Sequence, residues 1–300
     1  MHKTGELYAI TGSTGFLGKN FLKNFANYFP RARVVLLLNR AVPESIPEGW
    51  ETFSAPLGNE EALAHALQGV TTLIHFAGLT HADSKKEYWL ANALGTQSLV
   101  KAAQKNMVRK IIYISTRAIS DECGDYAKSK REGEFYIAES KIPFVILRFS
   151  EIYGVGSGEG INGLIKLVRK SPIIPYPYGA GLFAPLFLED AIAAILACLE
   201  RDYVINNRIY TLAGPNSHTF GELIGVISKV LRLKRIALPL PKIFFIILMI
   251  LGKKKNRPVL RYDQLVRMIC LKSDDIGLAK TDLGFQPRSF EDGVKNLILN

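Results

Sequence analysis

The sequence has few cysteines, few histidines and no apolar run long enough to cross a membrane. Its three cysteines (Cys123, Cys198 and Cys270) are odd in number and widely spaced, so they predict no disulfide framework. Neither they nor the five histidines have the spacing of metal ligands, so we expect no metal site. Because unpaired cysteines suit a reducing compartment, we expect a cytoplasmic protein. The apolar run Ile243–Leu251 has nine residues, whereas a bilayer span needs about 20.

The length and net charge of the chain limit its possible domain number and partners. A chain of 300 residues with 48% hydrophobic content can bury a full core, as one large domain or two closely joined ones. The net charge of +11 calls for an anionic partner: a phosphorylated cofactor, a phosphorylated substrate or an anionic membrane surface. The basic residues are dispersed and form no nucleic-acid-binding module, so we expect no nucleic-acid partner. A strand is predicted within a few residues of the N-terminus, so we expect no signal peptide.

A glycine-rich turn near the N-terminus dominates the sequence. The apolar run Leu7–Ile10 predicts a strand, T-G-S-T-G-F-L-G follows, and a helical pattern comes next. In such a turn Gly12 allows the sharp reversal, Gly15 lets the backbone approach a pyrophosphate, and Gly18 packs the helix on the strand. The helix N-terminus offers N–H groups to the anion. A glycine-rich surface turn is the alternative, but its place between strand and helix favours a dinucleotide site.

T-G-x-x-G-F-L-G resembles the cofactor motif of extended short-chain dehydrogenases/reductases, the NAD-dependent epimerase/dehydratase group. Two later segments are also similar to this family, His75-Phe76-Ala77-Gly78 to H-x-A-G/A and Arg148–Gly154 to R-x-x-x-x-Y-G. The resemblance implies an α/β, doubly wound, Rossmann-type fold with a mainly parallel sheet and a smaller C-terminal substrate subdomain. It places the NAD(P)-binding domain in 1–155 with a return segment at 184–212, and the substrate subdomain in 156–183 and 213–300. It also implies a homodimer through helices around 84–103 and 126–140.

The resemblance implies a cofactor site drawn from many segments. His75 is expected to be structural, because it ends a predicted strand without an acidic partner. Asn92 matches a family position that helps hold the geometry of the active site. The implied cofactor-binding residues are Gly12, Thr14, Gly15, Phe16, Leu17, Gly18, Asn39, Arg40, Leu57, Ala77, Gly78, Asn92, Tyr126, Lys130 and Ile152.

The residues after the second predicted strand bear on the choice of cofactor. Val34–Leu38 ends in Asn39-Arg40, with no acidic residue to bond the ribose hydroxyls of NAD. An arginine at this place accommodates the 2′-phosphate of NADP, so the sequence favours NADP(H) over NAD(H). The alternative is a solvated arginine at the end of a strand.

The implied catalytic residues are Thr116, Tyr126 and Lys130. Tyr126 and Lys130 have the Y-x-x-x-K spacing, which places both on one face of a helix. A free tyrosine titrates near pH ~10, and a nearby ammonium together with a positive nicotinamide favours the phenolate. Thr116, or less favourably Ser115, is expected to hydrogen-bond the substrate oxygen.

Three functions remain open. The first is an NAD(P)-dependent oxidoreductase acting on a carbonyl or alcohol of a small-molecule substrate. The second is a nucleotide-sugar epimerase with tightly bound NAD, in which Arg117 could hold the diphosphate. The third is a non-catalytic cofactor-binding protein. Arg117-Ala118 stand where dehydratases of the family have Asp-Glu, which disfavours a dehydratase. Glu151 either repels a diphosphate, which weakens the UDP-sugar alternative, or points into solvent.

The sequence does not identify the substrate. The substrate-side segments Gly156–Gly163 and Pro172–Gly181 are expected to be loops. The apolar run Ile243–Leu251 is followed by Lys253–Lys255. It predicts either a core or dimer helix with a basic tip, or an interfacial segment that makes peripheral contact with anionic lipid.

Overall fold

The computed structural model describes residues 6–201, 205–254 and 262–299, and the chain divides into two units. The first unit comprises Met1–Thr116, Lys128–Arg148 and Ile192–Tyr210; the second comprises Arg117–Ala127, Phe149–Ala191 and Thr211–Asn300. The second unit therefore takes in residues 117–127, 149–155, 184–191 and 211–212, which the sequence had placed in the cofactor domain.

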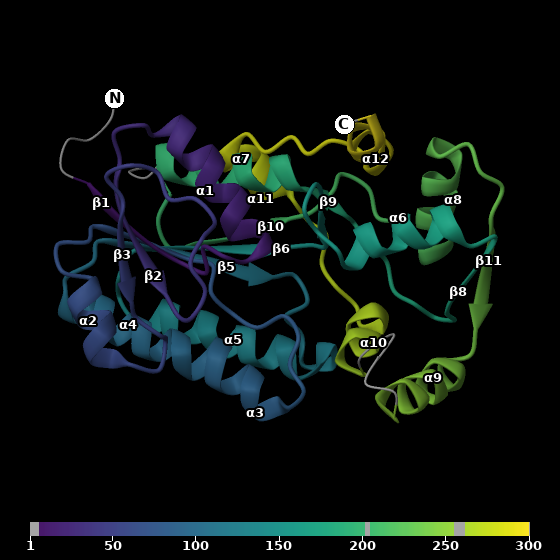
Figure 1. Ribbon diagram of the computed structural model, residues 1–300, viewed down its shortest axis with the longest axis horizontal. Helices are drawn as coiled ribbons and strands as arrows, with labels where there is room; N and C mark the ends of the chain where they lie inside the picture. Colours follow the sequence, from purple (N-terminus) through teal and green to yellow (C-terminus); the bar gives the residue numbers. More distant parts are fainter. Residues whose placement is uncertain (1–5, 202–204, 255–261, 300) are drawn as a thin grey trace. The chain divides into compact units, whose positions relative to one another are not determined.

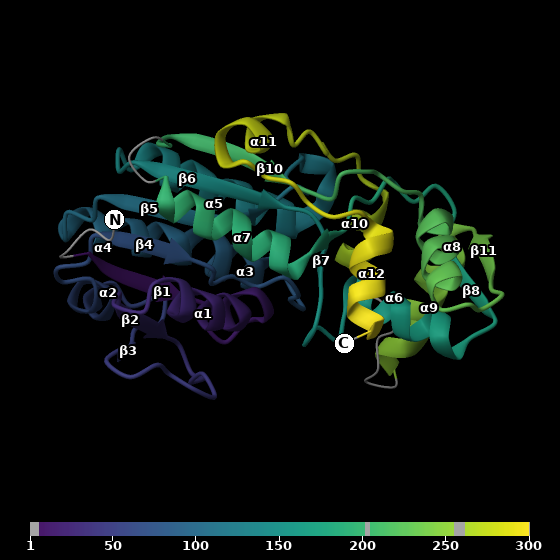
Figure 2. The same ribbon diagram turned by 90° about the horizontal axis from the view of Figure 1, so that it is seen from above.

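The main sheet has seven strands in the order β10-β6-β5-β4-β1-β2-β3 (Figure 2). These strands are β1 (Leu7–Thr11), β2 (Arg33–Leu38), β3 (Glu51–Ser54), β4 (Thr72–His75), β5 (Lys110–Thr116), β6 (Phe144–Phe149) and β10 (Arg208–Leu212). β1 pairs in parallel with both β2 and β4, so that Ile10 lies beside Leu36 and Ile74. The order and the parallel pairing confirm the predicted doubly wound, Rossmann-type sheet.

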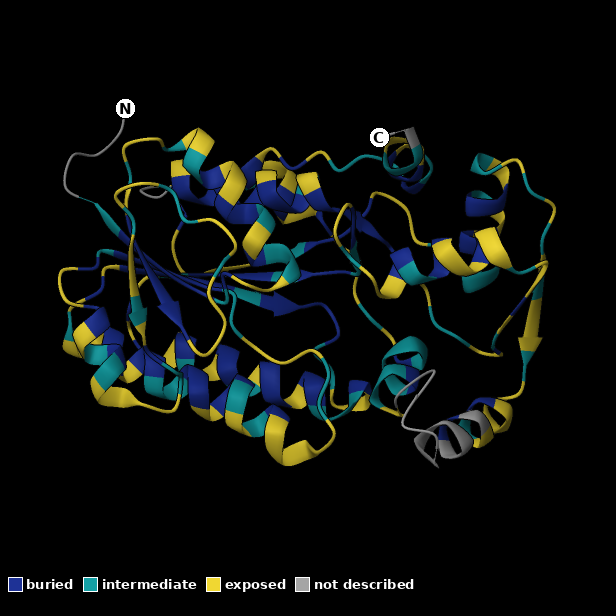
Figure 3. Cartoon of the chain, in the orientation of Figure 1, coloured by how far each residue is buried: buried dark blue, intermediate teal, exposed yellow. Residues whose placement is uncertain are grey.

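Helices cover both faces of this sheet. They are α1 (Phe16–Tyr28), α2 (Glu60–Ala66), α3 (Lys85–Tyr88), the π-helical turn η1 (Trp89–Leu94), α4 (Gly95–Lys105), α5 (Gly124–Glu139) and α7 (Leu188–Glu200). Figure 1 shows α1 and α7 on one face and α2, α4 and α5 on the other. Helices on both faces of the sheet bury β2 along almost its whole length (Figure 3). Its residues after Arg33 are all apolar because both of its faces are shielded from water. A core of apolar side chains from the sheet, α2, α4 and α5 fills one side.

The second unit contains two small parallel strand pairs and most of the C-terminal helices. Its elements are η2 (Asp121–Cys123), β7 (Ile152–Tyr153), α6 (Gly160–Lys170), β8 (Ile173–Pro177), β9 (Leu186–Phe187), α8 (Phe220–Val230), β11 (Ile236–Leu240), α9 (Lys242–Lys254), α10 (Tyr262–Ile269), α11 (Gly277–Leu283) and α12 (Phe290–Leu299). Its core joins apolar residues of α6, α8 and α12. A capping box formed by Thr219 and Glu222 starts α8.

Two segments expected to be loops are partly regular. Helix α6 begins at Gly160, inside the predicted loop 156–163, because its apolar residues face the core of the second unit. Ile173–Pro177 is strand β8, paired in parallel with β11. Prolines fit there because a two-stranded sheet has only edge strands, whose outer N–H groups are not needed for pairing.

Cys123 and Cys270 form a disulfide within the second unit, whereas Cys198 is a buried free thiol. The prediction of no disulfide is therefore wrong. Spacing could not reveal the pair, because the two cysteines are 147 residues apart in the sequence. The inference of a reducing, cytoplasmic compartment rested on unpaired cysteines, and it loses that support.

Helix α9 contains the apolar run Ile243–Leu251. Phe245 and Met249 pack with Leu265 of α10, while Ile243 and Ile247 are exposed. Lys255 lies outside the described residues. None of the described helices is long and apolar enough to cross a membrane.

Candidate active site

The glycine turn between β1 and α1 forms a tight backbone cradle. Gly12 has a φ of +70°, and a side chain there would place its Cβ 2.5 Å from the amide nitrogen of Ala77. Gly15 donates its N–H to the carbonyl of Gly12 at 3.1 Å. The hydroxyl of Ser13 is buried and has no hydrogen-bond partner among the residues that the structure describes. A buried hydroxyl without a partner at a helix N-terminus suits a bound phosphate oxygen.

His75, at the end of β4, is a fully buried structural residue. Its Nδ1 lies 2.7 Å from Thr11 Oγ1, its Nε2 lies 3.1 Å from Thr96 Oγ1, and its ring stacks on Tyr113. Burial, with a smaller contribution from the charge of Lys130, lowers the pKa of His75 to about 3. The imidazole is therefore neutral at physiological pH and fixes the strand ends behind the glycine turn, in line with the structural role expected for it.

Asn92 ties three segments of the first unit together. Its Oδ1 accepts the N–H of Leu79 at 2.7 Å, and its Nδ2 donates to the carbonyl of Leu79 and to Ser129 Oγ, each at 3.0 Å. A Cβ on Gly78 would lie 2.9 Å from Asn92 Oδ1 and 3.7 Å from Lys130 Nζ. The structure thus brings Gly78, Asn92 and Lys130 together, and the small residue at position 78 is needed for their approach.

Lys130 is almost completely buried on α5. Its Nζ donates to the carbonyl of Ile114 at 2.7 Å and lies 4.0 Å from the centre of the Tyr113 ring. Burial lowers the pKa of Lys130 to about 7, although the charge of Glu134 acts in the opposite direction. Ile114 lies two residues before Thr116 on β5, so the ammonium is anchored close to the end of that strand.

The two hydroxyls at the end of β5 differ in their surroundings. Ser115 Oγ donates to Glu134 Oε1 at 2.5 Å, and Glu134 is also paired with Arg148. Ser115 is therefore held in a structural network, which leaves Thr116, the last residue of β5, as the better candidate for a substrate contact.

Tyr126 lies in the first turn of α5, one turn before Lys130. Within the second unit, the guanidinium carbon of Arg267 lies 4.5 Å from the centre of the Tyr126 ring. The backbone N–H of Tyr126 donates to Asp263 Oδ1 at 3.5 Å. Sequence analysis missed both residues of α10, because no spacing relates them to the Y-x-x-x-K pair.

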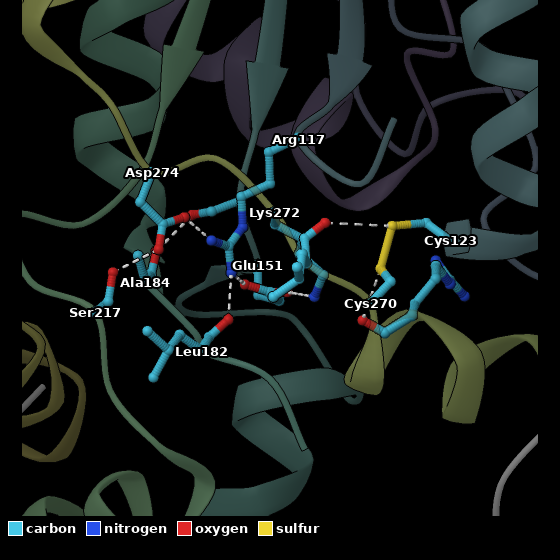
Figure 4. A network of polar contacts seen from close by, with 12 residues as sticks. Arg117, Cys123, Glu151, Leu182, Ala184, Ser217, Cys270, Lys272 and Asp274 are labelled. Atoms are coloured by element: carbon cyan, nitrogen blue, oxygen red, sulfur yellow. Dashed lines mark hydrogen bonds and ion pairs between the residues drawn. A yellow bond between two sulfur atoms is a disulfide. The ribbon is translucent and has the colours of Figure 1, made fainter. Parts of the chain in front are cut away.

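Arg117 forms the centre of an ion-pair network in the second unit (Figure 4). Its Nη2 lies 2.7 Å from Glu151 Oε2, and Nη1 pairs with Asp274. Lys272 Nζ lies 2.9 Å from Glu151 Oε1, and Ser217 donates to Asp274 at 2.5 Å. Burial alone would raise the pKa of Glu151, but the charges of Lys272 and Arg117 outweigh it and lower that pKa to about 2.

This network corrects two expectations from the sequence. Glu151 does not simply point into solvent, because both its oxygens are paired with cations. The side chain of Arg117 is only 1% exposed and is already paired with two carboxylates, so it is not available to hold a diphosphate, the role considered for it in the epimerase alternative.

Comparison with known proteins identifies the family. The model of the NAD dependent epimerase/dehydratase family matches residues 8–213. The chain belongs to this family. The expected family is confirmed.

Individual members of the family are only distantly similar. A ceramide reductase from Caulobacter vibrioides is 32% identical over 189 residues, which are 63% of this chain and 59% of the reductase. This chain therefore spans about three fifths of that relative. A UDP-glucose 4-epimerase from Vibrio cholerae is 24% identical over 95% of this chain and 92% of the epimerase. The enzyme WbmG from Bordetella bronchiseptica, solved with NAD, has a TM-score of 0.77 at 17% identity, covering 99% of this chain and 94% of WbmG.

The residues of this chain fit a bound dinucleotide. The glycine cradle and the buried Ser13 hydroxyl suit the pyrophosphate, and the Lys130 ammonium beside Gly78 suits a ribose. Thr14, Asn39 and Arg40 are exposed, while Phe16 and Leu17 are partly buried at the start of α1. A Cβ on Gly95 would lie 3.0 Å from Leu57 Cβ, and Ile152 pairs with Leu186 in the second unit. Leu57 and Ile152 thus pack against other parts of their own units.

Proposed function

We propose that this protein is an NADP(H)-preferring oxidoreductase that interconverts a carbonyl and an alcohol on a lipid-like substrate. The observation that carries the proposal is the placement of Lys130. Its ammonium is buried, is bonded to the carbonyl of Ile114 near the end of β5, and follows Tyr126 by one turn of α5. A buried lysine one turn after a tyrosine is suited to acid/base catalysis, because a buried ammonium contributes little to the charge of the surface.

In the proposed mechanism each residue has one task. The bound cofactor supplies or accepts the hydride. Tyr126 gives a proton to the carbonyl oxygen during reduction and takes it back during oxidation. Lys130 favours the phenolate form of Tyr126 and binds the ribose hydroxyls, and Thr116 hydrogen-bonds the reacting oxygen.

The ion-pair network of the second unit favours this function over a nucleotide-sugar epimerase. A diphosphate needs cations to bind it. Arg117 and Lys272 are instead matched by Glu151 and Asp274, so the network carries no excess positive charge. The ceramide reductase relative supports a lipid-like carbonyl as the first substrate class to test.

The experiment that tests the catalytic proposal uses Tyr126→Phe. This variant should bind cofactor as the wild type does and lose about 10²- to 10⁴-fold in kcat, because only the phenolic hydroxyl that exchanges the proton is removed. Full turnover in this variant would overturn the mechanism. Denaturing the purified protein and identifying any released nucleotide separates the alternatives, since tightly retained NAD would support the epimerase.

The preference for NADP(H) rests on Asn39 and Arg40. Both are exposed directly after β2, at the place where an acidic side chain would select NAD. Arg40→Ala should weaken NADPH binding by about tenfold or more and leave NADH binding unchanged, because only NADP carries the 2′-phosphate. Arg33→Ala, an equally exposed arginine at the opposite end of β2, is the control. Equal losses for both cofactors would refute the preference.

A homodimer is proposed through the helices of the first unit. Leu90 and Leu94 of η1 line a surface hollow with Trp89, and Phe135 of α5 is also exposed. Exposed apolar side chains of this size favour a protein contact. Light scattering should give a dimer that Leu90→Glu with Phe135→Glu converts to a monomer, whereas Met107→Glu, on an exposed loop, should not. A monomeric wild type would contradict the proposal.

Peripheral membrane contact is proposed for α9, whose Ile243, Phe244 and Ile247 are exposed. The Lys253–Lys255 segment adds positive charge suited to anionic lipid. The protein should float with phosphatidylserine vesicles and not with neutral ones. Ile247→Glu (50% exposed in the wild type) should abolish flotation, whereas Leu278→Glu (45% exposed, on α11) should not. Failure of the wild type to float would remove this part of the proposal.

A further inference from the structure

Helix α10 packs directly on the start of α5, within the second unit. Gly124 opens α5 with a φ of +86°, and a Cβ there would lie 2.8 Å from Asp263 Oδ1 and 3.5 Å from Val266 Cγ1. The Cys123–Cys270 disulfide joins the residue before Gly124 to the residue after α10. The structure therefore holds α10 against the first turn of α5 by packing and by a covalent bond.

Arg267 uses this contact to reach Tyr126. Its guanidinium carbon lies 4.5 Å from the centre of the phenol ring, within the range of a cation–π interaction. Arg267 Nε lies 3.1 Å from Asp263 Oδ2, one helical turn earlier on α10. Both side chains are less than one fifth exposed, so the guanidinium is restrained and partly desolvated.

The position of this cation has a chemical consequence. A cation over the face of an aromatic ring is attracted to its electrons, more strongly when the site excludes water. An ionised phenol carries additional negative charge, so the same cation favours the phenolate over the phenol. Asp263 opposes this effect, but it contacts the backbone of Tyr126, whereas Arg267 lies over the ring. Lys130 follows Tyr126 by one turn of α5, and Lys272 of the second unit is a further cation that interacts with Arg267.

We propose that Arg267 is a positioning residue for Tyr126: it holds the phenol ring from the α10 side and adds a second cation that favours the phenolate. The inference deepens the proposed function and rests on Tyr126 as its acid/base group. It differs from the Tyr-Lys pair in that the second cation comes from the C-terminal part of the chain, outside the segment that matches the family model.

The test measures the ionisation of Tyr126 directly and needs no substrate. Protein containing ring-labelled ¹³C-tyrosine is titrated by NMR, and the Tyr126 signal is assigned by its loss in Tyr126→Phe. In Arg267→Gln the phenol should ionise about one pH unit higher than in the wild type, and Arg267→Lys should restore most of the difference. Arg169→Gln removes an exposed arginine from α6 of the same unit and should change nothing. An unchanged titration in Arg267→Gln would overturn the proposal.

Two further measurements separate the possible failures. If Arg267→Gln does not fold, Arg267→Met, which keeps the apolar length of the side chain, replaces it in the same titration. If Tyr126→Phe retains turnover, the proposed catalytic function fails, while the titration still reports whether Arg267 acts on Tyr126.

Discussion

Arg117, whose side chain is buried, and the partly exposed Glu151 form an ion pair, 2.7 Å from Nη2 to Oε2, that joins the residue after β5 to the residue before β7. Lys272 and Asp274 complete it from the C-terminal part of the chain. Each cation is matched by a carboxylate, so the network stabilises the second unit only while it is complete.

Arg117→Met should destabilise the protein by about 1–3 kcal/mol, because it leaves the partly exposed carboxylates of Glu151 and Asp274 without the buried cation that they share. Urea unfolding measures the change. Lys101→Met is the control, since Lys101 pairs with Glu60 on the surface and should cost only about 0–1 kcal/mol. Similar small losses for both variants would contradict the buried character of the network.

The stability of the protein should depend on Glu151 at acid pH. The cations around it lower its folded-state pKa to about 2, below its unfolded value of about 4.3. A carboxyl group with a lowered pKa stabilises the fold above the unfolded value, and this contribution is lost as pH falls from about 4 through about 2. The free energy of unfolding, measured with urea between these pH values, should therefore fall less steeply with decreasing pH in Glu151→Gln than in the wild type. Parallel curves would contradict the prediction.

Reduction of the Cys123–Cys270 disulfide should lower the free energy of unfolding by about 2–5 kcal/mol, as for other native disulfides. Unfolding with and without a phosphine reductant measures the difference. The double variant Cys123→Ser with Cys270→Ser should be insensitive to the reductant. Thiol labelling of the denatured, unreduced protein should modify Cys198 only; modification of all three cysteines would show that the bond is not formed.

Gly15→Ala should separate cofactor binding from folding. An added Cβ would meet only the carbonyl of Gly12, at 3.4 Å, an ordinary contact, and Gly15 has an extended backbone that alanine adopts. We expect stability to change by less than about 0.5 kcal/mol and cofactor affinity to fall by about tenfold or more, because the methyl group occupies the approach to the pyrophosphate. Calorimetric titration with NADPH measures the affinity.

Two other glycine variants are controls for Gly15→Ala. Gly58→Ala, where a Cβ meets nothing within 4 Å, should bind cofactor as the wild type does. Gly12→Ala should fail to fold normally, because of its positive φ and the contact with Ala77. Unchanged cofactor affinity in Gly15→Ala would show that the pyrophosphate does not bind at this turn.

Local sequence patterns correctly indicated features whose residues are close together in the sequence. The glycine turn, the structural His75 and the Tyr126–Lys130 spacing each involve residues within one strand, turn or helix, where periodicity determines the geometry. The doubly wound, mainly parallel sheet followed from the family resemblance of those segments.

The remaining contacts join distant residues, which no spacing rule relates. Arg117 with Asp274, Cys123 with Cys270 and Tyr126 with Arg267 are each more than a hundred residues apart, so only the folded chain shows them. Strand β8 was missed for another reason, since its prolines indicate a loop unless the partner strand is known.

The order of these residues along the chain has a consequence for biosynthesis. Arg117, Cys123 and Tyr126 leave the ribosome well before Arg267, Cys270, Lys272 and Asp274 have been translated. Until then Cys123 is a thiol, and Arg117 lacks the carboxylate of Asp274. The surroundings of the first turn of α5 are therefore completed only near the end of translation. A prematurely terminated chain could keep every residue that identifies the family and still lack the groups that complete these surroundings.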